Sequence, residues 1–182
     1  MGKFVVGLII GLAIIPICAY FYFSTGMAPV ATAATPMPFE KKFANMALHA
    51  RVDQEAPKTV PITADEAAYS AGAQIYKEHC AVCHGVPGTQ QTAIAQGMFP
   101  KPPKLMEGKG VTDDPPGETY FKVSGGIRMT GMPAFDKTLS TTQMWQVSLL
   151  CANADKISPA VKQILTAPPA PSAVTAAETN KK

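Results

Sequence analysis

Hydrophobic positions divide the chain into one long apolar run near the N-terminus and a later region where apolar residues recur at helical spacing. The run from Phe4 to Phe23 is 20 residues long and contains no charged residue. At about 1.5 Å of rise per residue, a helix of this length crosses the hydrocarbon core of a bilayer. We therefore expect a single-pass membrane anchor at 4–23, after a short cytoplasmic N-terminus at 1–3.

A cleavable signal peptide is the alternative for the same run. Lys3 precedes it, and Ala31-Thr32-Ala33 has the small residues of a cleavage site. The apolar stretch of a signal peptide is usually only about 7 to 15 residues long, however. The length of the run therefore favours an anchor that is retained.

The next segment, 24–61, predicts a linker that contains one short helix. Residues 24–38 are rich in Ala, Thr, Pro and Ser, and their prolines oppose a regular helix. After them, apolar residues return at helical spacing and predict a short amphipathic helix from Phe39 to Arg51: Phe39, Phe43, Met46, Ala47 and Ala50. The pattern leaves open whether this helix docks on a partner subunit, on the following domain or on the bilayer.

Four further helices are predicted from their capping signals. Thr63-Ala64-Asp65-Glu66 and Ser140-Thr141-Thr142-Gln143 both match the capping box. The first expected helix runs from about Ala64 to Cys80, and the second from Pro115 or Pro116 to about Ser124, capped by Asp114 and stopped by Gly125-Gly126. The third runs from Ser140 to about Ala152, and the fourth from Ser158-Pro159 to about Leu165. No alternating strand pattern is present, so we expect an all-α fold.

Composition sets limits on function. The chain has 182 residues and a formal net charge of +3, and acidic and basic side chains balance between residues 64 and 165. Nucleic acid is therefore not an expected partner. Of the four cysteines, Cys18 and Cys151 stand alone and are interpreted as apolar fillers, with a regulatory thiol or a lipid attachment site as alternatives.

The other two cysteines carry the chemistry. Cys80-Ala81-Val82-Cys83-His84 is CxxCH, the motif of c-type haem attachment, in which two thiols bind the macrocycle and the next residue reaches the iron. A redox CxxC would need a thioredoxin-like strand context, and a zinc site would need a second Cys/His pair. We predict one covalent haem c, held by Cys80 and Cys83, with His84 as an iron ligand.

A second iron ligand is expected downstream. Met132 is the best candidate, because Gly131 and Pro133 shape an extended loop around it. Met129 is the nearest rival, and the more distant ones are Met98, Met106, Met144 and His49.

With these residues in place, 64–165 resembles the class I cytochrome c domain. Gly72 and Tyr76 match the family's glycine and aromatic pair, where the N-terminal helix crosses the C-terminal one, with Trp145 and Leu149 as the expected partners. Pro103-Lys104-Leu105 matches its Pro-x-Leu, which implies that the Pro103 carbonyl accepts a hydrogen bond from His84 and that Leu105 packs on the haem. The stretch from Gly131 to Phe135 resembles the family's methionine-ligand loop.

The resemblance implies one-electron transfer rather than catalysis. Methionine ligation raises the potential relative to bis-histidine ligation, so we expect a relay from a quinol-level donor to an oxidase or a soluble carrier. Haem attachment outside the cytoplasm implies a domain on the periplasmic side of the inner membrane. The layout is similar to anchored monohaem subunits of respiratory complexes such as alternative complex III, so redox proteins of such a complex are the expected partners. A haem enzyme or gas sensor with an open iron face, and a mainly scaffolding subunit, remain alternatives.

The predicted domain plan is therefore as follows: cytoplasmic N-terminus 1–3, transmembrane anchor 4–23, linker 24–61, cytochrome c domain 62–166 and disordered tail 167–182.

Overall fold

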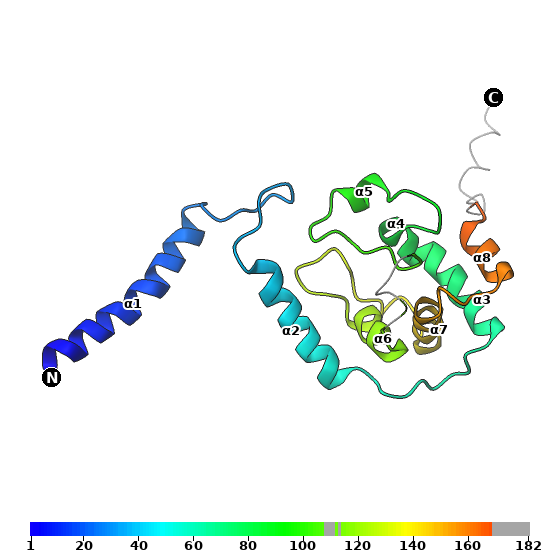
Figure 1. The fold of residues 1–182 in the computed structure, drawn as a ribbon, viewed down its shortest axis with the longest axis horizontal. Helices are drawn as coiled ribbons and strands as arrows, with labels where there is room; N and C mark the ends of the chain where they lie inside the picture. Colours follow the sequence, from blue (N-terminus) through cyan, green and yellow to red (C-terminus); the bar gives the residue numbers. More distant parts are fainter. Residues whose placement is uncertain (108–111, 113, 169–182) are drawn as a thin grey trace, which may run out of the picture. The chain divides into compact units, whose positions relative to one another are not determined.

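A computed structural model describes residues 1–107, 112 and 114–168. Its contacts divide the chain into two compact units, Met1–Asn45 and Met46–Lys182, and each is described by itself. All regular elements in the described ranges are helices (Figure 1). The predicted all-α fold is therefore confirmed. The predicted tail, 167–182, lies almost entirely outside the described residues.

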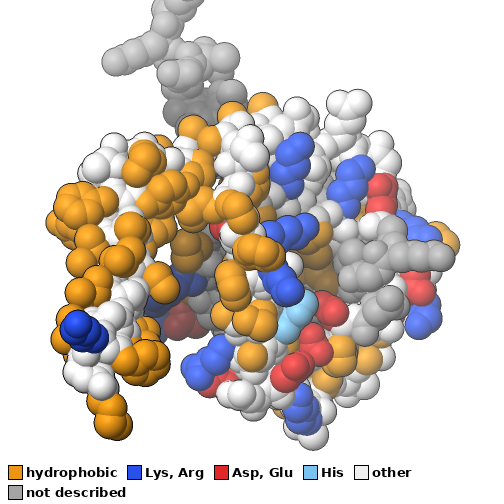
Figure 2. All heavy atoms as spheres, turned by 60° about the vertical axis from the view of Figure 1, so that its left-hand side comes forward, with side chains coloured by type: hydrophobic (Ala, Val, Ile, Leu, Met, Phe, Trp, Pro, Cys, Tyr) orange, Lys and Arg blue, Asp and Glu red, His pale blue; other side chains and the backbone are white. Residues whose placement is uncertain are grey.

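The first unit contains the N-terminal helix α1 (Gly2–Ser24) and the beginning of α2 (Glu40–Glu55). No residue of α1 is buried, and hydrophobic side chains cover it (Figure 2). By length and composition, α1 is a candidate membrane span. Cys18 is a free thiol, exposed on this helix.

The second unit holds the remaining elements, and α7 lies at its centre. They are α3 (Glu66–Ile75), the π-helical turn η1 (Tyr76–Cys80), α4 (Ala81–His84), α5 (Ala93–Gln96), α6 (Pro116–Gly125), α7 (Thr141–Ala152) and α8 (Pro159–Thr166). Helix α7 packs against both α3 and α6, and α8 packs against α3. The predicted helix from Ala64 to Cys80 is thus an α-helix whose last turn widens into η1.

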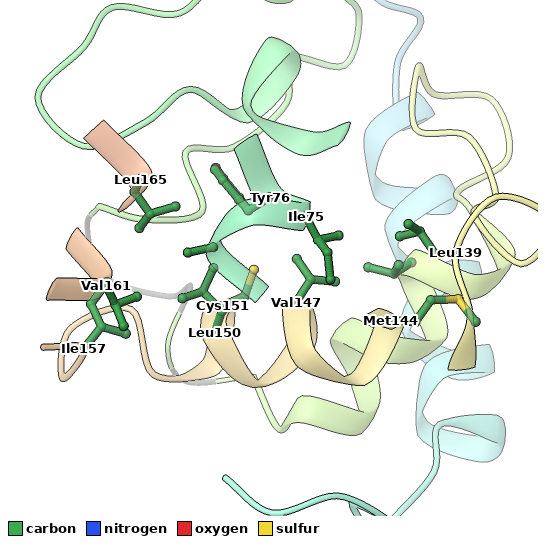
Figure 3. Close-up of a cluster of buried hydrophobic side chains, with 12 residues drawn as sticks. Ile75, Tyr76, Leu139, Met144, Val147, Leu150, Cys151, Ile157, Val161 and Leu165 are labelled. Atoms are coloured by element: carbon green, nitrogen blue, oxygen red, sulfur yellow. The ribbon is translucent and has the colours of Figure 1, made fainter. Parts of the chain in front are cut away.

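One hydrophobic core joins these helices. Leu150 and Val147 of α7, Tyr76 of η1 and Val161 of α8 all lie within it at 0–1% exposure (Figure 3). Complete burial of one large aliphatic side chain contributes about 1.5–3 kcal/mol. Cys151 is a free, buried thiol in the same cluster, as expected for an apolar filler.

Helices α3 and α7 cross at Gly72. A Cβ atom built on Gly72 would lie 2.4 Å from the Gln146 carbonyl oxygen and 3.1 Å from Leu150 Cβ. Only glycine allows this approach. The predicted crossing is present, and the α7 atoms nearest to a Cβ on Gly72 belong to Gln146 and Leu150 rather than to the expected partners Trp145 and Leu149. Trp145 instead stacks on Tyr120 of α6, with ring centroids 4.2 Å apart.

The helix starts match the capping predictions in part. Ser140 and Gln143 form the predicted capping box of α7. Thr63 does not cap α3. Asp65 does so instead, because its carboxylate accepts a hydrogen bond from the Ala68 N–H at 2.8 Å. Asp114 does not cap α6, because its carboxylate pairs with the Lys122 ammonium at 2.8 Å.

Helix α2 differs most from the prediction. It runs four residues further, to Glu55 rather than Arg51, and its buried residue is Val52, at 1% exposure. Ala56 is also buried, and the Pro57 carbonyl approaches Gly117 so closely that a Cβ there would collide with it. The predicted apolar stripe, which begins with Phe39, is exposed instead. Within the second unit, the segment after Met46 therefore packs on the start of α6.

Candidate haem site

The helical segment from α3 to α4 presents the CxxCH motif at its end. Cys80 closes η1, and His84 is the last residue of α4. Gly85 ends the helix with a φ of +73°, a value that favours glycine. The buried Tyr76 hydroxyl donates a hydrogen bond to the Gly85 carbonyl at 2.8 Å. The residue after His84 is thereby tied back to the core.

The two motif cysteines are free and half-buried. Burial, with a smaller contribution from Cys83, raises the pKa of Cys80 to about 12. The Cys80 sulfur therefore lies where a thiolate is disfavoured. A thioether carries no charge, so this environment suits a sulfur that is bonded to carbon.

His84 is oriented by a backbone carbonyl on a distant loop. Its Nδ1 lies 2.7 Å from the Pro103 oxygen. A carbonyl can only accept, so Nδ1 carries the proton and Nε2 of the neutral ring has a free lone pair. Burial lowers the pKa of His84, against the opposing effect of the Pro103 hydrogen bond. The ring is thus held in the tautomer and charge state that bind a metal through Nε2.

The loop that carries Pro103 is itself held by side chains. Gln91 Nε2 donates to the Pro102 carbonyl at 2.7 Å, and Lys104 Nζ donates to the Thr89 carbonyl at 3.3 Å. Leu105, predicted to pack on the haem, is partly buried against the core cluster. No sequence signal pointed to Gln91, because its role depends on a contact between residues eleven positions apart.

Met132 lies in a turn that a threonine closes. The Thr130 hydroxyl donates to the Ile127 carbonyl at 2.7 Å and accepts from the Met132 N–H at 3.1 Å. The Ile127 N–H donates to the Met132 carbonyl at 3.2 Å. Both backbone groups of Met132 are therefore fixed, the carbonyl by Ile127 and the N–H by a threonine that sequence reasoning missed.

Met132 and its nearest rival, Met129, differ in burial. Met132 is half-buried and packs against the core cluster. Met129 is 86% exposed and has a φ of +61°. Only Met132 of this pair is positioned with the core.

Two glycines of the same loop, Gly126 and Gly131, lie very close to neighbouring atoms. A Cβ on Gly126, whose φ is +65°, would lie 2.6 Å from the Ala134 nitrogen. A Cβ on Gly131 would lie 2.9 Å from Met98 Cε. Met98 comes from the segment after His84, so the two loops of the site touch each other directly.

Comparison with known proteins agrees with this geometry. The family model for cytochrome c oxidase, cbb3-type, subunit III matches residues 67–149, which hold both CxxCH and Met132. This segment is a class I cytochrome c domain. It contains α3 through most of α7, whereas α1 and the linker lie outside the match.

Two individual proteins are similar to part of this chain. Quinohemoprotein alcohol dehydrogenase ADH IIB of Pseudomonas putida is 32% identical over 92 residues, which are 49% of this chain but only 11% of that protein. A chain of the reducing HAO-like protein complex of Kuenenia stuttgartiensis is 26% identical, with a TM-score of 0.46. That match covers 59% of this chain and 54% of the other.

A cytochrome c domain implies covalent haem c and electron transfer. The donor set fits this group, because two free cysteines lie beside a neutral histidine with an available Nε2. When bound, the haem supplies an iron that alternates between two oxidation states.

Proposed function

We propose that this chain is a membrane-anchored monohaem cytochrome c that relays single electrons between a quinol-level donor and an oxidase or a soluble carrier. Cys80 and Cys83 form the thioether links, and His84 and Met132 are the two axial ligands. Pro103 orients His84 through its carbonyl, and Leu105 packs on the macrocycle. The proposal assigns one haem per chain, because the sequence contains a single CxxCH motif.

One observation carries the proposal: the hydrogen bond from His84 Nδ1 to the Pro103 carbonyl, at 2.7 Å. This bond leaves Nε2 free and prevents rotation of the ring. Redox chemistry at a CxxC motif does not require a histidine held in this way. An iron ligand does, because the imidazole must keep one orientation in both oxidation states. A zinc ligand would be held similarly, but the described residues contain no group of three or more His, Cys, Asp or Glu side chains that could bind the metal.

The Met132 loop supports the same role. Its backbone is fixed at both sides of the residue, so its thioether needs little rearrangement when the charge at the site changes. A sulfur ligand and an apolar setting both favour the reduced state and raise the potential. Such a potential suits acceptance from a quinol and donation to an oxidase-level acceptor.

The chain offers no catalytic group for a reaction of its own under this proposal. If His84 and Met132 both bind the iron, no position would remain on it for a substrate. The protein would contribute electron transfer to a larger respiratory complex, whose other redox subunits are its partners.

The location follows from the anchor. We place α1 across the inner membrane with its N-terminus in the cytoplasm and the cytochrome c domain on the periplasmic side. The segment between α1 and the domain keeps the domain near the membrane, which raises its effective concentration at a partner.

A spectrum of the membrane fraction tests this function. We expect a reduced c-type band in membranes from cells that produce the chain, and its loss in Cys80→Ser. Cys18→Ser is the matched control and should keep the band, because Cys18 lies on α1. A band that persists at full intensity in a Cys80→Ser, Cys83→Ser double variant would contradict the proposal.

A further inference from the structure

Apolar side chains lie on opposite sides of helix α2, counting Phe39 directly before it. Val52, at 1% exposure, belongs to the side that packs within the second unit. Phe39, Phe43 and Met46 are 66%, 59% and 57% exposed. At about 100° per residue, Phe43 lies roughly 180° around the helix from Val52. One side of α2 is thus used for packing, whereas the other is open over the described residues.

The open side begins beside the end of α1. A hollow of about 700 Å³ in the first unit joins the last turns of α1 to the residues just before α2. Its lining is apolar or aromatic: Cys18, Ala19, Phe21, Tyr22, Phe23, Met27, Met37 and Pro38. The start of α2 therefore lies close to the C-terminal end of α1. If α1 spans a bilayer, that end of the helix is at the membrane surface.

The backbone holds the two phenylalanines together at this point. Phe39 has a φ of +63°, which is rare for a bulky residue. The turn is closed by the Met37 N–H, which donates to the Glu40 carboxylate at 2.9 Å. The Phe39 and Phe43 rings meet edge to face with centroids 6.3 Å apart. An unfavourable backbone conformation is thus retained at an aromatic pair that the first unit leaves exposed, which indicates a function outside the fold.

We propose that the Phe39 and Phe43 face of α2 lies in the headgroup region of the membrane that α1 spans. Aromatic side chains are favoured at this depth, and amphipathic helices bury their apolar side there. Lys42 lies about 100° around the helix from Phe43, at the edge of this face, and its long side chain can reach lipid phosphates while its stem stays among the acyl chains. The proposal rests on α1 as the anchor and adds a second, peripheral contact with the same membrane.

Tryptophan fluorescence in the full-length holoprotein tests this contact. The protein is reconstituted into nanodiscs of phosphatidylcholine and phosphatidylglycerol, with or without bromine on the acyl chains as a quencher. Phe43→Trp places the probe on the proposed face. Asn45→Trp is the matched control, because it lies two residues away and about 200° around the same helix. The signal of the native Trp145, which is 3% exposed, is measured in the parent protein and subtracted.

Brominated lipid should lower the emission of the Phe43→Trp probe by about twofold or more, and that of the Asn45→Trp probe far less. Equal quenching of the two probes, or no quenching of the first, overturns the proposal. The Phe43→Trp probe could also be shielded from acrylamide only when other subunits copurify with the protein. That result would assign the face to a protein partner and would also overturn the proposal. If the holoprotein does not enter nanodiscs, the proposed anchor is wrong and the membrane contact of α2 falls with it. This outcome is distinguishable from the others because it is seen before any quenching is measured.

Discussion

Two hydroxyl groups fix the backbone beside the two residues that we propose as iron ligands. Thr130 bridges two backbone groups of the Met132 turn, and Tyr76 ties the residue after His84 to the core. Neither side chain is proposed to touch iron. Both fix the backbone from which a proposed ligand projects.

Replacement of Thr130 tests this role on the methionine side. Thr130→Val keeps the shape but removes the hydroxyl that accepts from the Met132 N–H, at a cost of about 1 kcal/mol. We expect a lower midpoint potential and faster binding of carbon monoxide to the reduced protein, because the Met132 thioether leaves the iron more easily. Thr130→Ser keeps the hydroxyl and should behave like the parent. Parent-like binding of carbon monoxide by Thr130→Val would show that this bridge is dispensable.

Replacement of Tyr76 tests the histidine side. Burial raises the pKa of Tyr76 far above its usual range, so its phenol stays protonated and donates to Gly85 at any ordinary pH. Tyr76→Phe leaves a buried carbonyl without this partner, and we expect a loss of about 1–3 kcal/mol in the free energy of unfolding. Denaturant unfolding measures it, with Tyr69→Phe as the control at a half-buried tyrosine. Equal losses in the two variants would refute the assigned hydrogen bond as the cause.

At the scale of elements, the crossing of α3 and α7 depends on one missing side chain. Gly72→Ala would place a Cβ 2.4 Å from the Gln146 oxygen, so the helices must separate. We expect a destabilisation of about 1–3 kcal/mol in denaturant unfolding. Gly125→Ala is the matched control, since nothing lies within 4 Å of a Cβ at that position. A stability change that is no larger at Gly72 than at Gly125 would contradict the close crossing.

The contact between Pro57 and Gly117 makes a second element-level prediction. A Cβ on Gly117 would collide with the Pro57 carbonyl oxygen, at 1.8 Å. In Gly117→Ala, we expect the segment from Met46 to Pro61 to exchange its amide hydrogens faster, because it can no longer pack on the start of α6. Hydrogen exchange read by mass spectrometry measures this, again beside Gly125→Ala. Unchanged protection of the segment would indicate that its packing does not depend on Gly117.

The helices themselves were largely predictable, whereas their contacts were not. Local signals such as the Ser140 capping box mark where a helix begins, and α7 begins there. At α3, two neighbouring residues both had capping chemistry, and the side chain that reached the free N–H was Asp65 rather than Thr63. For α2, helical spacing identified an apolar stripe, but the side that packs is the one around Val52. Periodicity gives the faces of a helix and not the neighbours that cover them.

Over the whole molecule, the spacing of Cys80, Cys83 and His84 was sufficient to identify the attachment motif, because its geometry lies within five consecutive residues. The Pro103 contact required the resemblance to a family, since it joins residues 19 positions apart. Thr130 and Gln91 escaped prediction because hydroxyl and amide side chains are common in loops and acquire a role only through the folded backbone. The open face at Phe39 emerged only when the packing of α2 was known.

The most direct test of the account is a redox titration of the purified full-length protein combined with a haem determination. We predict one covalent haem per chain and a single one-electron transition of a six-coordinate, low-spin iron. We also predict that Met132→Ala lowers its midpoint potential and opens the iron to carbon monoxide. A chain without haem, or a Met132→Ala variant with the potential and spectrum of the parent, would contradict the assignment of His84 and Met132 as the ligands of an electron relay.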